Sequence, residues 1–568
     1  MSDATAVGTA APGGTREALA AFFEARSLAM VALGFASGLP FLLIFDTLSA
    51  WLREVGLTLG VIGFFSLATL VYSFKFLWAP LVDRTEVPVL TPWLGHRRSW
   101  MLVCQGLIIL GLWMVAGTDP TTDLGRMALF AVFVGLASAT QDIAIDAWRI
   151  EIADVSRQGV MASAYQWGYR VATIVAGAVP LFLASSFGWN ISYGVMAALM
   201  GIGVVATLLA PRETAHSVRD IHAEDVPHRP GRDTAEWALR LAIMGVGALI
   251  LGSGLAANAS LLASVLAVFG LNGAGESVVA AWRSPAGVWL QFLAVIAGFG
   301  VVILAVWPVP GTRTLPGVYL SAALGDPLRN FFDRYGRAAS VILALICLYR
   351  LSDFVLNIMN PFYLDLGFTL NEVAEVRKIF GVVATMLGVF SGGYAIARFG
   401  MLPSLLVGAL AGPLSNLVFI WLATRGHQLY ALFVSIGVEN VLSGFAGTCL
   451  IAYMSSLTAA GFTATQYALF SSLYALPGKL VASQSGRIVE SAAQSAETGG
   501  FWSGLRGLFG GLAPGSFADS VERSGVSPTS LGAGYVAFFL YSAAIGVFAI
   551  ALAIVVFRRE RARVAGGP

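Results

Sequence analysis

Charged residues and cysteines are scarce in this chain. Only 12% of its 568 residues are Asp, Glu, Lys or Arg, about half the share found in soluble domains. The three cysteines, Cys104, Cys347 and Cys449, all fall in apolar runs, so they indicate neither a disulfide framework nor a metal site. A net charge of +2 provides no basic face for a nucleic acid. These shortages exclude a disordered chain, a disulfide scaffold and nearly every soluble enzyme.

Common catalytic motifs are missing as well. The sequence has no Walker loop, no HExxH or CxxC metal spacing and no GxSxG nucleophile elbow. None of the five histidines falls in a predicted membrane span, which argues against an intramembrane hydrolase, and an ATP-driven pump would need a nucleotide domain. We therefore expect no enzyme activity, no metal and no cofactor.

Apolar residues, by contrast, are abundant: 57% of the chain belongs to the AVILMFWYC set, beside 64 glycines. A membrane-spanning helix needs about 20 mostly apolar residues, and backbone groups in lipid must pair within the helix. Within the long apolar stretch 238–270, Asn258 either ends one helix or separates two. The apolar runs predict fourteen spanning helices: 28–50, 59–79, 99–117, 127–148, 160–184, 191–210, 238–258, 286–308, 338–360, 372–397, 403–424, 430–454, 463–483 and 534–557.

Loop arginines predict the orientation, because cytoplasmic loops carry an excess of Lys and Arg. With the N-terminus in the cytoplasm, 21 loop and tail arginines fall on the cytoplasmic side and 7 on the other side. We therefore expect a multi-pass membrane protein with both termini in the cytoplasm.

Polar stretches divide the predicted spans into groups of six, two and six. The long segment 484–533 falls on the outer side. We expect it to be a weakly ordered insertion, although it could cap the entrance of the transport path. Two six-helix halves are typical of the major facilitator architecture, an all-α fold whose substrate site lies between the halves near the midplane. The predicted units are a cytoplasmic tail 1–27, an N-terminal bundle 28–210, a linker 211–237, an inserted helix pair 238–308, a linker 309–337, a C-terminal bundle 338–557 and a cytoplasmic tail 558–568.

A weak signature follows the second predicted span. In the major facilitator superfamily the loop there reads Gly-x-x-x-Asp-Arg-x-Gly-Arg-Arg. Here Asp83-Arg84 is followed, after ten residues, by Gly95-His96-Arg97-Arg98. The loop is therefore either a stretched form of the signature or an ordinary positive loop, and we assign Asp83, Arg84 and Arg97 a gating or structural role.

Twelve charged residues fall inside predicted spans, where each costs about 2.5–3.5 kcal/mol at the bilayer centre if it is unpaired. They must therefore pair, reach the interface or line a watery cavity. These residues are Asp46, Lys75, Asp142, Asp146, Arg170, Arg350, Asp353, Glu375, Arg377, Lys378, Glu439 and Lys479.

The densest group lies in the span 127–148. Asp142 and Asp146 are four residues apart and Arg149 follows three residues later, so all three share one helical face. Two acids this close repel each other, which favours proton binding by one of them. We expect Asp142 to be the leading proton carrier and Asp146 the second. In the alternative interpretation, Arg149 pairs with Asp146 merely to fix the helix.

Aromatic and cationic residues on two other spans are candidates for cargo binding. Tyr72 and Lys75 lie together on one span, and Tyr169 and Arg170 on another. Aromatic rings stack on sugar faces, and Arg binds carboxylates through two hydrogen bonds. The alternative is an ion pair between helices, such as Lys75 or Arg170 with Asp142.

Further candidates complete the predicted site. In the second half, Glu439-Asn440 occupies roughly the place of the first half's polar cluster, while Arg350 and Asp353 could simply satisfy each other. The stretch Gly34-x-x-x-Gly38-x-Pro40 predicts close helix packing and a kink. The remaining cavity candidate is Gln141.

Several strings resemble the AmpG muropeptide permease family of the major facilitators. The resemblance covers nearly the whole chain except the N-terminal tail, the inserted pair and 484–533. The matching strings are Gly34–Pro40, 62–66, 74–80, 141–148, 349–353, 371–378, 381–385, Glu439-Asn440 and 464–469.

This resemblance implies a location in the bacterial inner membrane and import of N-acetylglucosaminyl-1,6-anhydro-N-acetylmuramyl peptides from periplasm to cytoplasm, driven by protons. The import would serve cell-wall recycling and, in some bacteria, β-lactamase induction. It also implies the two extra helices. We expect a monomer in the lipid bilayer with no nucleic-acid partner. The first alternative is a permease for another anionic cargo, such as an acyl-CoA, a peptide or a sugar. The second is a membrane receptor that transports nothing.

Overall fold

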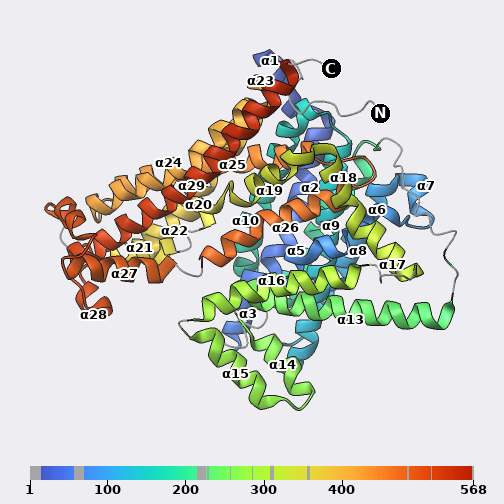
Figure 1. Ribbon diagram of the computed structural model, residues 1–568, viewed down its shortest axis with the longest axis horizontal. Coiled ribbons are helices and arrows are strands. Elements are labelled where there is room, and N and C mark those ends of the chain that lie inside the picture. The colour runs from blue at the N-terminus through green and yellow to red at the C-terminus, as the bar shows by residue number, and fades with distance from the viewer. Residues whose placement is uncertain are drawn as a thin grey trace.

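The computed structural model shows a helical chain made of two bundles and an insert (Figure 1). Among the described residues, eleven helices are long and apolar enough to cross a membrane, and they coincide with eleven predicted spans. The other three predicted spans, 59–79, 338–360 and 463–483, each include residues outside the described part, so the count of fourteen stays a prediction. The structure describes residues 14–56, 70–213, 226, 229–255, 258–284, 286–307, 313–354, 358–482, 485–512 and 515–565.

The N-terminal bundle begins after the short helix α1 (Thr15–Ala20). Its first long helix carries Pro40 in its last turn and continues through a π-helical turn, η2 (Leu43–Thr47), because proline removes one backbone donor from the helix. Its helices are α2 (Ala25–Leu42), α3 (Leu48–Glu54), α5 (Leu70–Phe74), α6 (Ala79–Arg84), α7 (Leu90–Leu94), α8 (His96–Ala116), α9 (Leu124–Glu151), α10 (Gln158–Phe187), α11 (Trp189–Leu199) and α12 (Gly201–Leu209).

Glycine lets α2 and α10 lie against each other. A Cβ at Gly38 would lie 2.8 Å from the Tyr169 carbonyl oxygen, and a Cβ at Gly34 would meet the Tyr165 carbonyl even more closely. From the other helix, a Cβ at Gly168 would clash with the Val31 carbonyl oxygen. The two backbones are thus in direct contact, which holds Tyr165 and Tyr169 beside α2.

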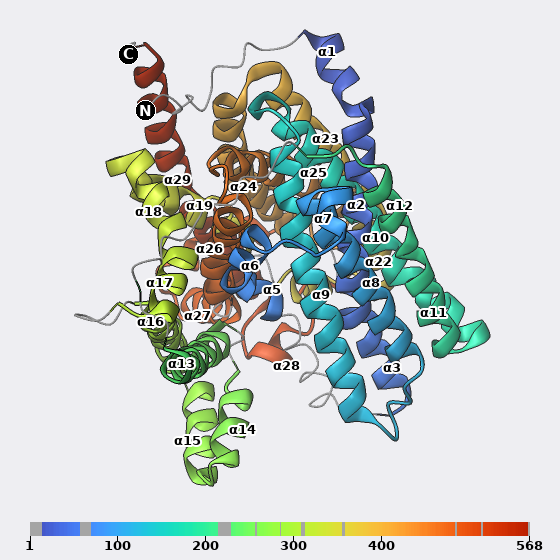
Figure 2. The same ribbon diagram turned by 90° about the vertical axis from the view of Figure 1, so that its right-hand side faces the viewer.

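The insert comprises α13 (Pro230–Leu255), α14 (Ser260–Val268), α15 (Asn272–Arg283) and α16 (Gly287–Val306). Asn258 separates two helices, and its side-chain oxygen accepts a hydrogen bond from the Ser260 amide at 2.8 Å. The helices α13 and α16 pack side by side, and α14 and α15 project beyond them (Figure 2). Phe299 of α16 stacks on Phe76 of the first bundle at 6.1 Å.

The C-terminal bundle follows a connection made of α17 (Leu315–Leu320), the π-helical turn η6 (Ser321–Gly325) and α18 (Asp326–Tyr335). Its helices α24 and α29 run side by side away from the end where α1 lies (Figure 1). The elements are α19 (Ala339–Leu348), α20 (Leu351–Phe354), α21 (Met359–Asp365), α22 (Leu370–Ala374), η9 (Glu375–Phe380), α23 (Gly381–Phe399), α24 (Met401–Arg425), α25 (Leu429–Ser456), α26 (Thr463–Ala482) and α29 (Pro528–Ala565).

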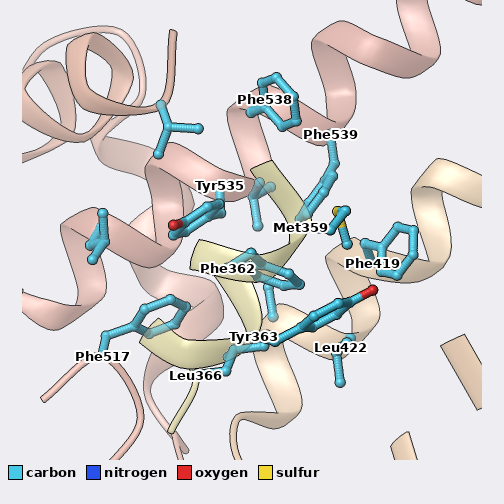
Figure 3. Packing of buried hydrophobic residues seen from close by; sticks show 14 of the residues in the cluster. Met359, Phe362, Tyr363, Leu366, Phe419, Leu422, Phe517, Tyr535, Phe538 and Phe539 are labelled. Atoms are coloured by element: carbon cyan, nitrogen blue, oxygen red, sulfur yellow. The ribbon is translucent and has the colours of Figure 1, made fainter. Parts of the chain in front are cut away.

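In the outer segment 484–533, the described residues 485–512 and 515–533 are folded, so the expectation of a weakly ordered insertion was wrong for them. It forms α27 (Ser485–Glu497), a 3-10 turn (Ser503–Phe509) and α28 (Ser520–Ser524). Phe517 is buried and stacks on Tyr535 of α29 at 6.0 Å. Phe362 contacts Tyr535 and Phe539 in the same cluster (Figure 3). A core of this kind was hidden from sequence reasoning because the segment is rich in Ser and Gly.

Replacing Gly168 by alanine should destabilise the protein, because the added methyl group forces α2 and α10 apart. Overpacking of this kind costs about 1–3 kcal/mol. The control is Gly177→Ala on the same helix, where a Cβ would meet nothing within 4 Å. We expect the thermal midpoint of the purified protein to fall for Gly168→Ala only. Equal midpoints for the two variants would contradict this packing.

Glu497 should hold the outer segment in a pH-dependent way. Hydrogen bonds from the Ser527 hydroxyl and amide, at 2.5 and 2.9 Å, and from Ser530 lower the pKa of Glu497 from 4.5 to about 2. The stabilisation is therefore present above pH 4.5 and is lost as the pH falls from about 4.5 to about 2. We expect Glu497→Gln to lower the melting temperature at pH 7 and to differ little from the parent near pH 2. A constant difference across this range would refute the assignment.

Candidate functional site

One side of the contact between the bundles is made by α10 against α23 and α25. The Ser163 hydroxyl donates a hydrogen bond to the Val389 carbonyl. The Trp167 indole donates to the Met386 carbonyl at 2.9 Å, and the Gln166 amide donates to the Thr448 hydroxyl at 2.7 Å. All of these contacts lie in the first three turns of α10, at the end that loop arginines assign to the cytoplasm.

The other side of the contact is the N-terminus of α26, and Asp83 caps it. The Asp83 carboxylate accepts hydrogen bonds from the amides of Ala464 and Thr465, at 3.2 and 2.8 Å, and from the Thr465 hydroxyl at 2.6 Å. The free amides and the dipole at a helix N-terminus stabilise an anion there. A residue of the first bundle thereby caps the N-terminus of a helix in the second bundle.

Arg97 holds this carboxylate in place. Its guanidinium is fully buried and pairs with Asp83 and with Glu151, both at 2.7 Å. The neighbouring Arg98 instead donates to the carbonyls of Thr207 and Leu208. The stretched spacing seen in the sequence thus still brings Asp83 and Arg97 together, and the short helix α7 occupies five of the ten residues between Arg84 and Gly95.

Beyond Trp167 the bundles separate. Val171 and Ile174 of α10 are 39% and 46% exposed, and Val383 and Leu387 of α23 are 53% and 58% exposed. An apolar groove of about 650 Å³ lies within the C-terminal bundle, between Phe380, Val383 and Leu387 on one side and Phe433, Val438 and Val441 of α25 on the other. Among the described residues, the hydrogen bonds between the bundles lie at the end assigned to the cytoplasm, and toward the outer end the bundles are apart.

The helix that carries Lys75 is interrupted at this residue. Lys75–Leu77 forms a 3-10 turn between α5 and α6. The Lys75 ammonium lies 3.6 Å from the Asp146 carboxylate. Irregular backbone at membrane depth is tolerated where protein buries it or where it lines a cavity. At this 3-10 turn Lys75, the only lysine whose side chain is described, points toward Asp142 and Asp146 of α9.

Asp146 is shared between two cations. Besides Lys75, Arg149 approaches it at 3.4 Å. Arg149 is fully buried and lies over the ring of Tyr467 on α26, 5.1 Å from the ring centroid. Two of its nitrogens, Nε and Nη1, have no protein hydrogen-bond partner. The local Asp146–Arg149 pair thus exists, but it also forms part of the contact between the bundles.

Asp142 has a different environment one turn away. It is 8% exposed, and its carboxylate accepts a hydrogen bond from the Ser37 hydroxyl at 2.5 Å. Ser37 also shares a hydrogen bond with the Tyr165 hydroxyl at 2.7 Å. No cation within 4 Å pairs with Asp142 among the described side chains. Lys75 is within electrostatic range of Asp142, but the groups in direct contact with this carboxylate are hydroxyls.

The remaining first-half candidates differ in access. Gln141 is fully buried and donates to the Ala36 carbonyl at 3.0 Å, so cargo does not reach it in this conformation. The Tyr72 hydroxyl is buried and has no hydrogen-bond partner among the described residues, and its ring packs edge-on against Phe41 at 5.2 Å. Tyr169 is half-buried beside Tyr165. Arg170 is exposed although it sits midway along α10.

A second charged group lies on the C-terminal bundle. Arg350 pairs with Asp353 at 2.7 Å and donates to the Ser443 hydroxyl at 2.5 Å. Glu439 is half-buried and within electrostatic range of Asp353 and of three arginines, Arg170, Arg350 and Arg377. Arg170 comes from the first bundle, so this group spans both bundles.

The two residues Asn440 and Lys378 complete the candidates near that group. Asn440 accepts a hydrogen bond from the Thr385 hydroxyl at 2.7 Å and donates to the Ile436 carbonyl at 2.9 Å. Both partners belong to its own bundle. The side chains of Lys378 and Lys479 lie outside the described residues.

Sequence reasoning missed the partners supplied by distant helices. Thr465, which binds Asp83, lies 382 positions away in the sequence, and although it belongs to the family-like string 464–469, nothing in that string indicates Asp83 as its partner. Ser37 had a detectable signal, since it stands three residues after Gly34 on the same face of α2. Gln166 and Thr448, which join the bundles, had none.

Comparison with known proteins agrees with this architecture. The model of the Major Facilitator Superfamily matches residues 18–482. The anhydromuropeptide permease of Escherichia coli K12 is 30% identical over 473 residues, 83% of this chain and 75% of that one. Transporter AmpG 4 of Rickettsia felis is 27% identical over 471 residues, 82% and 91% of the two chains. A solved proton:xylose symporter, XylE, aligns with a TM-score of 0.50 and 11% identity, covering 95% of each chain.

The chain belongs to the Major Facilitator Superfamily and, within it, to the family of the AmpG permeases. The predicted fold class is thereby confirmed: this is a polytopic helical transporter, and not an enzyme.

Replacing Asp83 by alanine should loosen the cytoplasmic-side contact, because it removes the cap of α26 and one counter-charge of Arg97. Breaking a buried ion pair costs about 3–5 kcal/mol. We expect cysteine reporters at the buried position Ala468 to become reactive from that side. Asp123→Ala, an exposed acid paired only with Arg126, is the control. Unchanged reactivity in Asp83→Ala would show that the cap does not hold the contact.

Proposed function

We propose that this transporter imports anhydromuropeptides, N-acetylglucosaminyl-1,6-anhydro-N-acetylmuramyl peptides, from the periplasm into the cytoplasm by proton symport. It would act in the bacterial inner membrane, with both termini in the cytoplasm, and serve cell-wall recycling and thereby resistance to β-lactams. Two observations support the proposal together: the relationship to the permeases, and a buried acid, Asp142, that has hydroxyl partners and no cation within 4 Å among the described side chains.

Asp142 is suited to exchange a proton. A carboxylate without a counter-charge is costly in a membrane protein interior, whereas its protonated form is not. Lys75 and Arg149 are engaged by Asp146, so Asp142 loses charge most cheaply by binding a proton. The two acids thus have different roles: Asp142 carries the proton, and Asp146 forms ion pairs with Lys75 and Arg149.

The charges of the second bundle are suited to an anionic cargo. Among the described side chains of this group, three arginines accompany two acids, Asp353 and Glu439, so one positive charge is left over. The exposed side chain of Arg170 is free to form two hydrogen bonds with a carboxylate. Tyr169 stands next to it and offers a ring face to a sugar. The stem peptide and the saccharide of a muropeptide provide both groups.

The proposed cycle follows from the conformation described. With the outer ends apart, cargo and a proton enter and bind between the bundles. Neutralising Asp142 and the arginines lowers the cost of closing the outer ends, so both ligands favour the inward-facing state and are thereby coupled.

Proton-driven uptake is the decisive test. Right-side-out vesicles should accumulate labelled anhydromuropeptide by up to about tenfold per pH unit if one proton moves with each cargo. Asp142→Asn should lose accumulation while still exchanging labelled for unlabelled cargo, because exchange needs no net proton movement. Asp154→Asn, which changes an exposed loop acid, should behave like the parent.

The same vesicles separate the alternatives. Accumulation that ignores the gradient would remove the coupling, and normal accumulation by Asp142→Asn would remove the residue assignment. Competition by an acyl-CoA, peptide or sugar, with no effect of anhydromuropeptide, would indicate another anionic cargo. Binding without any exchange would indicate a receptor that does not transport.

A further inference from the structure

The connection between the insert and the C-terminal bundle, residues Leu315–Tyr335, crosses the closed contact between the bundles; we call it the strap. It consists of α17, η6 and α18. Its second half is bound firmly to α26. The Gln466 side chain donates to the Pro327 carbonyl at 2.8 Å, and the buried ring of Phe331 packs against Phe470 at 5.2 Å. This part of the strap therefore belongs mechanically to the C-terminal bundle.

A second attachment of α18 supports the same conclusion. Arg334 donates to the Leu457 carbonyl at 2.7 Å, just before α26 begins. It also reaches the side-chain oxygen of Gln466 at 3.3 Å. Both ends of α18 are thus joined to the start of α26.

The first half of the strap is bound to the other bundle. The Arg84 guanidinium donates to the Ala322 carbonyl at 2.9 Å. Ala322 lies in the π-helical turn η6, and such turns are often found at functional sites. A charged donor to a carbonyl is among the stronger hydrogen bonds.

The attachment points adjoin the cap of α26 in sequence. Asp83 binds Thr465, while the next residue of each pair, Arg84 and Gln466, holds the strap. When Asp83 leaves Thr465, Arg84 moves with the first bundle and Gln466 with the second. The strap cannot keep its hydrogen bonds to both residues when the bundles move apart.

We propose that the strap is a latch on the cytoplasmic side of the transporter, and that the bond between Arg84 and the Ala322 carbonyl is the one that breaks when this side opens. The attachment at Gln466 and Phe470 persists. The latch adds to the resting stability of the closed contact, whichever cargo the transporter carries.

Cysteine accessibility tests the latch without any cargo. The reporter is Ala468→Cys, a position buried between α26 and the first bundle, in a full-length chain whose Cys104, Cys347 and Cys449 are replaced by alanine. Inside-out vesicles expose the cytoplasmic side to a maleimide. We expect Arg84→Gln to increase the labelling rate about tenfold, equivalent to about 1.4 kcal/mol, and Arg84→Lys to restore slow labelling, because lysine retains a charged donor.

Arg329→Gln is the matched control, since it removes the same charge from an exposed side chain of the strap for which no contact is observed. It should label at the parent rate. A parent rate for Arg84→Gln would overturn the latch, as would equally fast labelling of Arg84→Lys or of Arg329→Gln.

A covalent bridge gives a second, independent test. Cysteines at positions 84 and 322, joined by a flexible cross-linker of about the length of an arginine side chain, should stop uptake and keep the reporter thiol at position 468 unreactive; the reduced sample should recover both. Continued uptake by the cross-linked protein would refute the latch. Loss of the gradient effect on uptake, with normal latch behaviour, would instead refute only the proposed proton coupling.

Discussion

A charged group in a membrane interior needs a counter-charge, a helix end or water, and this constraint organises the whole transporter. Asp83 shows how it works. The carboxylate uses one oxygen for Arg97 and the Ala464 amide, and the other for Thr465. Because these partners belong to different bundles, satisfying one buried charge also holds the two bundles together. The same atoms must find water when the bundles part, which makes the contact reversible.

The other charged side chains differ in how closely they are paired. Arg350 and Asp353 satisfy each other within one bundle. Asp146 has two cations at 3.4 and 3.6 Å, both longer than an ideal charged hydrogen bond. The described groups in direct contact with Asp142 are hydroxyls, and the side chain of Arg170 is exposed. The ion pair between Asp83 and Arg97 at the closed end is short, whereas Asp142 and Arg170 have no counter-charge in direct contact among the described residues. Such a difference suits a transporter, because charges without a close counter-charge can bind a proton or a cargo.

Local patterns predicted much of this arrangement. The pairs Asp146–Arg149 and Arg350–Asp353 could be expected from their spacing of three residues on a helix, and Gly34 and Gly38 from the need for close packing. The polar stretches 211–237 and 309–337 indicated the division into two bundles and an insert. Interactions between distant helices could not be predicted: the choice of Asp146 instead of Asp142 by Lys75 depends on the 3-10 turn at Lys75, and the folded core around Phe517 depends on Tyr535 and Asp365. From its composition, the segment 484–533 is polar, and its few aromatic residues are far apart in the sequence, so no core could be predicted there.

Whether one proton and one cargo cross together is best measured as proton flux. Adding anhydromuropeptide to weakly buffered, right-side-out vesicles without an imposed gradient should make the medium more alkaline, because protons leave it with the cargo. The alkalinisation should disappear in Asp142→Asn. Cargo entry with no change in the pH of the medium would contradict the account.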